Sequence, residues 1–125
     1  MKAKITMVLR ILLGLMMVFF GLNGFFHFMP LPPAPEAAAN FMGALVNSGY
    51  LMVLVKGLEV IAGLLLIFNL YTRAALTILA PIMLNAFLFH LFLDPAGVGG
   101  ATLAFGLVIY LIISDWSHFK ILVSK

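Results

Sequence analysis

Residues 74–93 read AALTILAPIMLNAFLFHLFL, which is a run of 20 residues without a charged side chain between Arg73 and Asp94. A helix needs about 20 mainly apolar residues to cross a bilayer core of roughly 30 Å. Apolar residues follow one another here instead of alternating with polar ones, which excludes the strand of a membrane β-barrel. Because a segment in lipid must pair its backbone polar groups internally, the stretch predicts a membrane-spanning helix.

Three other stretches have the same character. Hydrophobic residues make up 65% of the 125-residue chain and charged residues only 9%, whereas soluble domains are about 45–50% apolar and about 25% charged. The few charges divide the chain into four predicted membrane spans, at about residues 5–26, 50–70, 74–93 and 96–114. We therefore expect a single integral membrane domain over residues 1–125, with an all-α fold that forms a four-helix transmembrane bundle.

The connections between the spans are short, except for the first. Residues 70–73 and the Asp-Pro pair at 94–95 leave room only for tight loops, which makes consecutive spans antiparallel neighbours. The first connection holds prolines at positions 30, 32, 33 and 35 and is expected to be stiff and extended. Residues 36–46 then predict a short extracytoplasmic helix, too short to span the membrane, with a Pro-Glu pair suited to its first turn.

Nearly all basic residues lie on one side of the predicted membrane. The two outer loops hold the acidic Glu36 and Asp94 and no Lys or Arg. Six of the seven basic residues share the other side: Lys2, Lys4, Arg10, Arg73, Lys120 and Lys125. The positive-inside rule therefore predicts that both termini are cytoplasmic. The basic, apolar amino-terminal segment resembles a secretory signal, but no small-residue cleavage site follows it promptly, so we expect it to be retained.

The composition also excludes several classes of function. The chain has no cysteine, which excludes disulfides, thiol redox catalysis and cysteine-ligated metal centres. The net charge of +3 is explained by the basic residues that set the membrane topology and by their attraction to anionic lipid headgroups. Basic and aromatic residues are not interleaved in a patch, so we expect no nucleic acid partner.

Glu59 is the acidic residue that lies within a predicted span. It comes about nine residues into the second span, so about 14 Å below the outer surface and near the bilayer centre. Lys56 precedes it by three residues on the same helix face. A charge at this depth costs roughly 2.5–3.5 kcal/mol by insertion scales and normally has a partner. Two interpretations stay open: a buried ion pair that only locks the bundle, and a ligand or proton site.

Other polar side chains of the outer half reach comparable depths. Asn85 is expected about 12 Å deep in the third span, and His90 about 5 Å deep. The candidate ligand-binding residues are Glu59, Lys56, Asn85, His90, His27 and Asn23. Asn85 and His90 are separated by about 140° on an ideal helix, so they face one target only if Pro81 kinks the span.

The histidines raise the question of a metal or a haem, because histidine is the commonest metal ligand. No ligand motif such as His-Glu-x-x-His is present, so we predict no metal site. Hydrogen bonding at the membrane interface is the favoured interpretation of His27 and His90, and a bis-histidine haem is the alternative. On the other side of the membrane, Arg10 is expected to snorkel or to form a structural ion pair with Asp115.

Small residues recur at helical spacing along the predicted spans. They are Gly14, Gly21 and Gly24 in the first span, Gly63 in the second, and Thr102 and Gly106 in the fourth, where Tyr110 continues the four-residue spacing. Small side chains let membrane helices approach closely, so we expect these stripes to be helix–helix interfaces.

Several segments have a pattern typical of one family. The first span contains RILLG at 10–14 and FFGLNG at 19–24, and the second contains KGLEVIAGLLL at 56–66. These segments resemble the arginine–glycine opening and the glutamate signature of the DoxX family of small four-helix membrane proteins. Arg73 and the third span with Asn85 fit the continuation, so the resemblance covers nearly the whole chain.

The resemblance implies a bacterial or archaeal protein of the cell inner membrane that serves a quinone-linked redox enzyme. We therefore expect an accessory subunit that binds a quinone-like or lipid ligand in its outer half. A structural or chaperone-like membrane protein without a small-molecule site is the alternative. The chain is not expected to be an enzyme on its own. Its expected partners are the lipid bilayer and either a redox enzyme or a second copy of itself, and a quinone or lipid is its candidate cofactor.

Overall fold

The computed structural model describes residues 2–26 and 35–124, which are almost entirely helical and hold no strand. The helices are α1 Lys2–Phe26, α2 Glu36–Asn47, α3 Leu51–Phe68, α4 Thr72–Phe92, η1 Pro95–Gly97, α5 Val98–Ser114, α6 Trp116–Phe119 and η2 Lys120–Val123. Within the described ranges, four segments are long and apolar enough to cross a membrane: Ala3–Gly24, Leu51–Phe68, Thr72–Phe92 and Pro95–Ser114. The predicted all-α four-helix membrane bundle, with a short helix between its first two spans, is thereby confirmed. Most of the predicted proline-rich segment lies outside the described residues.

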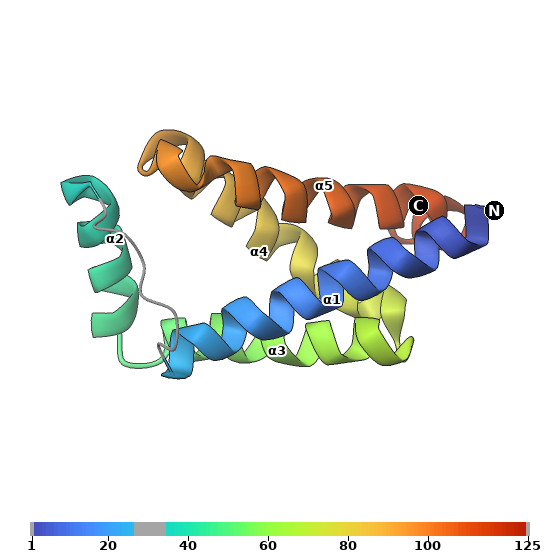
Figure 1. The fold of residues 1–125 in the computed structure, drawn as a ribbon, viewed down its shortest axis with the longest axis horizontal. Helices are drawn as coiled ribbons and strands as arrows, with labels where there is room; N and C mark the ends of the chain where they lie inside the picture. The colour runs from blue at the N-terminus through green and yellow to red at the C-terminus, as the bar shows by residue number, and fades with distance from the viewer. Residues whose placement is uncertain (1, 27–34, 125) are drawn as a thin grey trace.

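The long helices are arranged as two packed pairs. In Figure 1, α1 and α3 lie side by side, α5 runs along the opposite edge of the molecule, and α4 crosses between them. The closest pairings are α1 with α3 and α4 with α5. Both termini lie at one end, which we call the basic end because it carries the Lys and Arg residues of α1, α4 and η2. The other end holds α2 and η1, and we call it the opposite end.

The turn between α3 and α4 makes these two helices antiparallel neighbours. Asn69 ends α3 with φ 56° and ψ 43°, a left-handed conformation in which asparagine is the best-tolerated residue after glycine. Tyr71 is also left-handed, with φ 49°. The hydroxyl of Thr72 donates a hydrogen bond of 2.9 Å to the side-chain oxygen of Asn69. The chain therefore reverses within a few residues, and the start of α4 lies beside the end of α3.

α1 and α3 approach each other closely along a row of glycines. A Cβ added to Gly14 would lie 2.7 Å from the carbonyl oxygen of Gly63, and one added to Gly63 would lie 2.7 Å from the carbonyl oxygen of Gly14. A Cβ on Gly21 would lie 2.6 Å from Cγ2 of Val60. These distances are shorter than real Cβ contacts, and at Gly14 and Gly63 the obstacle is backbone, so these two positions require glycine. The stripes predicted for the first two spans are confirmed as a helix–helix interface.

The stripe predicted for the fourth span is not an interface within the chain. A Cβ on Gly106 would meet no described atom within 4 Å, and Thr102 is exposed. The buried residues of α5 are Ala104, Leu107, Val108 and Leu111. Gly106 lies two residues from Ala104 and from Val108, which is about 200° around the helix, so it faces away from the core. The predicted face therefore points outward at Thr102 and Gly106, whereas Tyr110, the next residue of the same four-residue spacing, packs against the core.

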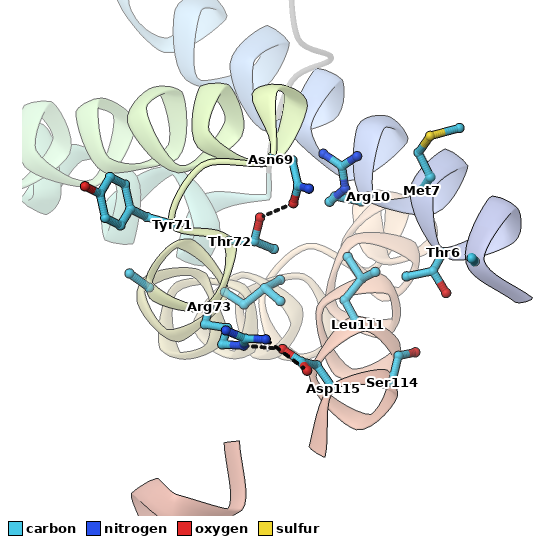
Figure 2. Close-up of a pocket in the computed structure, with 13 residues that line it drawn as sticks. Thr6, Met7, Arg10, Asn69, Tyr71, Thr72, Arg73, Leu111, Ser114 and Asp115 are labelled. Carbon is cyan, nitrogen blue, oxygen red and sulfur yellow. Dashed lines mark hydrogen bonds and ion pairs between the residues drawn. The ribbon is translucent and has the colours of Figure 1, made fainter. Parts of the chain in front are cut away.

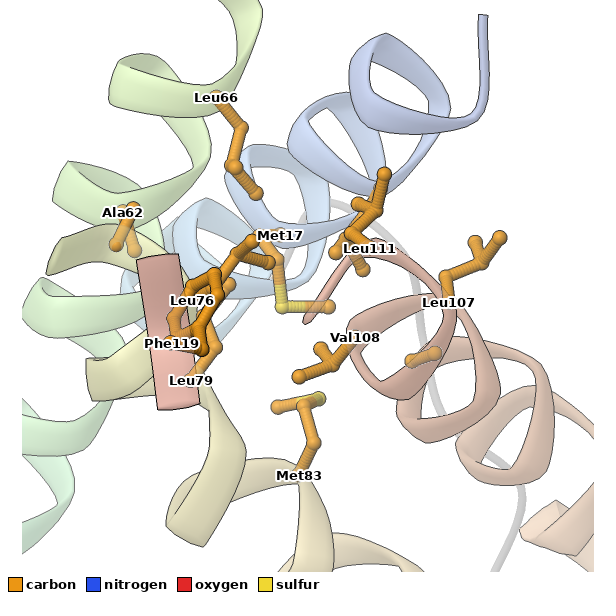
Figure 3. Close-up of a cluster of buried hydrophobic side chains, with 13 residues drawn as sticks. Met17, Ala62, Leu66, Leu76, Leu79, Met83, Leu107, Val108, Leu111 and Phe119 are labelled. Atoms are coloured by element: carbon orange, nitrogen blue, oxygen red, sulfur yellow. The ribbon is translucent and has the colours of Figure 1, made fainter. Parts of the chain in front are cut away.

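The apolar core lies where α1, α3, α4 and α5 meet, and Phe119 of α6 joins it (Figure 3). Its fully buried side chains include Leu13, Met17, Leu66, Leu76, Leu79 and Val108. Many large hydrophobic side chains are exposed on the outer faces of the helices, among them Ile61, Phe68 and Ile113. A soluble protein rarely presents apolar surface on this scale, whereas the acyl chains of a bilayer cover it. The molecule is therefore built for a lipid environment.

Candidate functional site

Lys56 and Glu59 form an ion pair near the middle of α3. The Nζ atom of Lys56 lies 3.2 Å from Oε2 of Glu59. The spacing of three residues places the two side chains on neighbouring turns of one helix face. Glu59 is only 6% exposed and lies about 12 Å along the helix from Leu51. A carboxylate is therefore held deep in the membrane, with a lysine as its ionic partner.

α1 packs directly over this ion pair. A Cβ added to Gly24 would lie 2.7 Å from Cγ and 2.8 Å from Cδ of Lys56, so the alkyl chain of the lysine rests in the space that Gly24 leaves. A Cβ on Gly21 would lie 3.0 Å from the carbonyl oxygen of Lys56. Asn23, on the same helix, is 7% exposed. The side chain of Lys56 nevertheless keeps 22% of its surface exposed.

Two of the other candidate ligand residues, Asn85 and His90, do not lie around Glu59. Asn85 is exposed on the outer surface of α4. The buried residues of α4 are Ala75, Leu76, Leu79 and Met83. Position 85 lies two residues beyond Met83, about 200° around the helix, so its side chain points away from the core. The similar depths predicted for Asn85 and Glu59 suggested that the two side chains meet. They do not, because Asn85 lies on the face of α4 that points away from the core.

His90 has its own contacts at the corner between α4 and η1. Its Nδ1 lies 3.2 Å from the backbone oxygen of Asp94 and 3.9 Å from a carboxylate oxygen of the same residue. A Cβ on Gly97 would lie 2.4 Å from this nitrogen, so glycine is required for the ring to fit. The ring therefore braces the corner. His27 lies outside the described residues, and the haem alternative needs it.

A pocket of about 1100 Å³ opens at the basic end of the bundle (Figure 2). It lies between the first turns of α1, the α3–α4 turn and the end of α5. Its polar lining residues include Thr6, Arg10, Asn69, Arg73, Ser114 and Asp115. The sequence did not indicate this pocket, because its walls come from three segments that are far apart in the chain. The one feature of the sequence that points to this pocket is the grouping of Arg10 and Arg73 on the same predicted side of the membrane.

Arg10 and Asp115 have different partners from those predicted. Nη1 of Arg10 donates to the backbone oxygen of Leu66 and lies 3.4 Å from that of Ile67. The carbonyls in the last turn of a helix lack intrahelical partners and carry the negative end of its dipole, so Arg10 caps α3. Asp115 is bound instead by Arg73, whose Nε lies 2.5 Å from Oδ2.

The exchange of partners follows from the pairing of helices. Arg73 lies in the first turn of α4 and Asp115 directly follows α5. These antiparallel neighbours bring the two residues to the same end. His118 adds a contact of 2.7 Å between its Nδ1 and Oδ1 of Asp115. The hydrogen bond from Arg73 lowers the pKa of Asp115 below its ordinary value, and partial burial opposes this shift. Asp115 is therefore a stable anion that holds α6 to the start of α4.

Residues 2–26 and 35–124 contain no group of three or more His, Asp or Glu side chains arranged to hold a metal ion. Four apolar helices with buried polar groups define the class: the protein is a multi-pass α-helical membrane protein. It belongs to the DoxX family, whose family model matches residues 5–91. The matched region runs from α1 almost to the end of α4 and includes Arg10, Lys56, Glu59 and Arg73. Neither the curated proteins nor the solved structures include a match to the chain.

Proposed function

We propose that this DoxX-family protein is an accessory membrane subunit that binds the polar head of a quinone-like or lipid ligand at Lys56 and Glu59. The observation that carries the proposal is the burial of Glu59, paired with Lys56, halfway along a membrane-crossing helix. An ionisable residue near the bilayer centre costs roughly 2.5–3.5 kcal/mol on insertion scales, and such residues commonly mark ligand or ion sites. A ligand can reach the side chain of Lys56, which is 22% exposed.

Lys56 is the proposed contact residue and Glu59 the residue that positions it. An ammonium group has three donors, and its contact with Glu59 engages one side of it. The exposed 22% of the lysine side chain leaves room for an acceptor, such as a quinone carbonyl or a lipid ester oxygen. Val53, an exposed apolar residue one turn before Lys56 on the same helix, would contact the tail of such a ligand. Asn85 is not part of the proposed site, because its side chain faces away.

The proposed location is the inner membrane, with both termini in the cytoplasm. Six of the seven Lys and Arg residues support this orientation by the positive-inside rule. Lys56 is nearer to the opposite end of α3 than Glu59 is, so a ligand would enter from the outer leaflet. The proposed partner is a quinone-linked redox enzyme that shares this ligand.

The test is binding of a photoreactive ubiquinone analogue and of labelled phospholipid to the purified chain in nanodiscs. Lys56→Met and Glu59→Gln are the site variants, and Asn85→Leu is the matched control, since it removes a polar group from the same membrane region outside the site. We expect the site variants to lose about tenfold in affinity for one of the ligands, equivalent to one hydrogen bond to a charged group. If folded site variants bind both ligands like Asn85→Leu, the proposal is wrong.

A structural or chaperone-like role is the second candidate function. The close contact of Gly21 and Gly24 with Lys56 favours it, because an ion pair clamped between α1 and α3 stabilises the bundle without any ligand. In that case Glu59→Gln and Lys56→Met lower the unfolding temperature, and the affinity for both ligands is unchanged. A partner protein that copurifies with the chain in the absence of a quinone would support this second role.

A further inference from the structure

We propose that the pocket at the basic end is a binding site for a phosphate group, with Arg10 and Asn69 as the contact residues. The proposal is independent of the function proposed for Lys56 and Glu59, because the two sites lie at different levels of the bundle. The pocket of about 1100 Å³ exceeds the usual range of small-ligand pockets, about 300–1,000 Å³, and is open to the surface. It is therefore large enough for a phospholipid headgroup.

The pocket carries one positive charge that no carboxylate balances. Arg73 is neutralised by Asp115 at 2.5 Å. In the described part of the chain, Arg10 has no carboxylate within ion-pair distance, and its hydrogen bonds go to backbone oxygens at the end of α3. A guanidinium has five N–H donors, and the contacts of Arg10 to α3 use only Nη1. The other N–H groups of Arg10 can donate hydrogen bonds to an anion.

Asn69 supplies a second donor beside Arg10. Its side-chain oxygen accepts the hydrogen bond from Thr72, which leaves its amide N–H groups for a ligand. Figure 2 shows the side chains of Arg10 and Asn69 close together, on the same side of the pocket. A guanidinium fork matches two oxygens of a phosphate, and an amide N–H can bind a third oxygen.

The apolar part of the lining indicates that the anion belongs to an amphiphile. Met7, Leu76 and Leu111 line the pocket together with the polar residues. Arg10 contacts the last turn of α3, so its guanidinium lies at the end of a membrane-spanning segment. The end of a membrane-spanning segment is the depth at which lipid phosphates lie. A soluble phosphate would use the same two donors, and the experiment separates the two sources.

The experiment uses the full chain in a neutral detergent, with native mass spectrometry and thermal unfolding as readouts. The probes are phosphatidylglycerol, the matching diacylglycerol, which lacks the phosphate, and inorganic phosphate. We expect phosphatidylglycerol to bind about tenfold more tightly than diacylglycerol, as one charge-assisted contact provides. Binding of inorganic phosphate at millimolar concentration, without a preference between the lipids, would identify a soluble phosphate as the ligand of the same residues.

Two variants test the contact residues, and a third is the control. Arg10→Gln removes the charge, and Asn69→Gly removes the amide while keeping the left-handed conformation of the turn. Lys120→Gln removes a basic residue that does not line the pocket. We expect the first two variants to lose the preference for the anionic probe, and Lys120→Gln to keep it. Equal binding of all three probes by wild type, or retention of the preference in Asn69→Gly and in folded Arg10→Gln, overturns the proposal.

Discussion

Gly14 and Gly63 face each other across the interface between α1 and α3. The carbonyl oxygen of each glycine lies in the space that a side chain on the other would need. The contact joins two helices that are separated in the sequence by α2 and its connections. It brings α1 close enough to cover the Lys56–Glu59 pair, which lies on the same side of α3. The backbone contact is therefore a condition for the buried charges as well as for the fold.

We predict that Gly63→Ala lowers the free energy of unfolding by about 1–3 kcal/mol, the usual cost of an overpacked interface. The matched control is Gly57→Ala on the same helix, where an added Cβ meets no described atom within 4 Å. Alanine at that position is expected to be neutral or stabilising by up to about 1 kcal/mol, because it favours the helix. The measurement is unfolding in mixed micelles, and equal effects of the two variants would contradict the prediction.

The second prediction concerns the ion pair on α3. Lys56→Met leaves a carboxylate buried without its ionic partner and is expected to destabilise the fold by about 3–5 kcal/mol. The double variant Lys56→Met, Glu59→Leu removes both charges and is expected to restore most of the loss. Unfolding of the two single variants and the double variant gives the coupling free energy between the residues. A coupling near zero would mean that the contact of 3.2 Å contributes nothing to stability.

Glu59→Lys extends the same argument. It places two ammonium groups three residues apart on one face of α3, in an environment that neither water nor salt screens. We expect this variant to fold much less well than Glu59→Gln, which keeps the shape of the side chain. The yield of monodisperse protein after detergent extraction measures the difference.

A third prediction follows from the anion at the start of α6. Because the pKa of Asp115 is lower in the folded state than its ordinary value of 3.8, its interactions stabilise the fold above that pH. They are lost as the pH falls through the lowered pKa. Trp116, the chain's single tryptophan, follows Asp115 directly and reports on this region. We expect its emission to shift only below about pH 4 in the wild type.

In Asp115→Asn the contact with Arg73 is weakened at every pH. The emission of Trp116 should then be shifted at neutral pH already and should change little on acidification. Asp94→Asn, at the opposite end, is the control and should keep the wild-type profile. The contribution to global stability is expected to be at most about 1 kcal/mol, because the pair is partly exposed. A wild-type emission profile in Asp115→Asn would contradict the assigned role.

The fold was predictable because charges are so rare in this chain that the long uncharged stretches between them stand out as membrane spans. The close contact of α1 and α3 was predictable as well, because glycines at helical spacing have few other uses in a membrane. The partner of Arg10 was not. Several charged residues share the basic end, and only the three-dimensional pairing of α4 with α5 assigns Asp115 to Arg73.

The position of Asn85 shows a second limit of the sequence. Its depth follows from counting residues, but the direction of its side chain depends on which face of α4 packs inward. That face is set by Leu76, Leu79 and Met83, which look no more apolar than their neighbours in a span where nearly every residue is hydrophobic. Periodicity identifies the buried face of a soluble helix, and it is weak in a helix that is apolar all round.

The last prediction concerns orientation. We expect both termini in the cytoplasm and α2 outside, because the basic residues lie at the end that carries the termini. The chain has no cysteine, so a single introduced thiol reports one position. Asn40 is a suitable outer site because it is exposed on α2, whereas the neighbouring Ala38 is fully buried and a cysteine there would be protected in either orientation.

Ser124, exposed just beyond η2, is the matched inner site. A membrane-impermeant maleimide applied to intact cells should label Asn40→Cys and not Ser124→Cys. After the membrane is permeabilised, both variants should react, which shows that each thiol is accessible. Labelling of Ser124→Cys alone in intact cells would reverse the topology. It would place Arg10, Arg73 and the phosphate pocket on the outer side, and a ligand of Lys56 would then enter from the cytoplasmic leaflet.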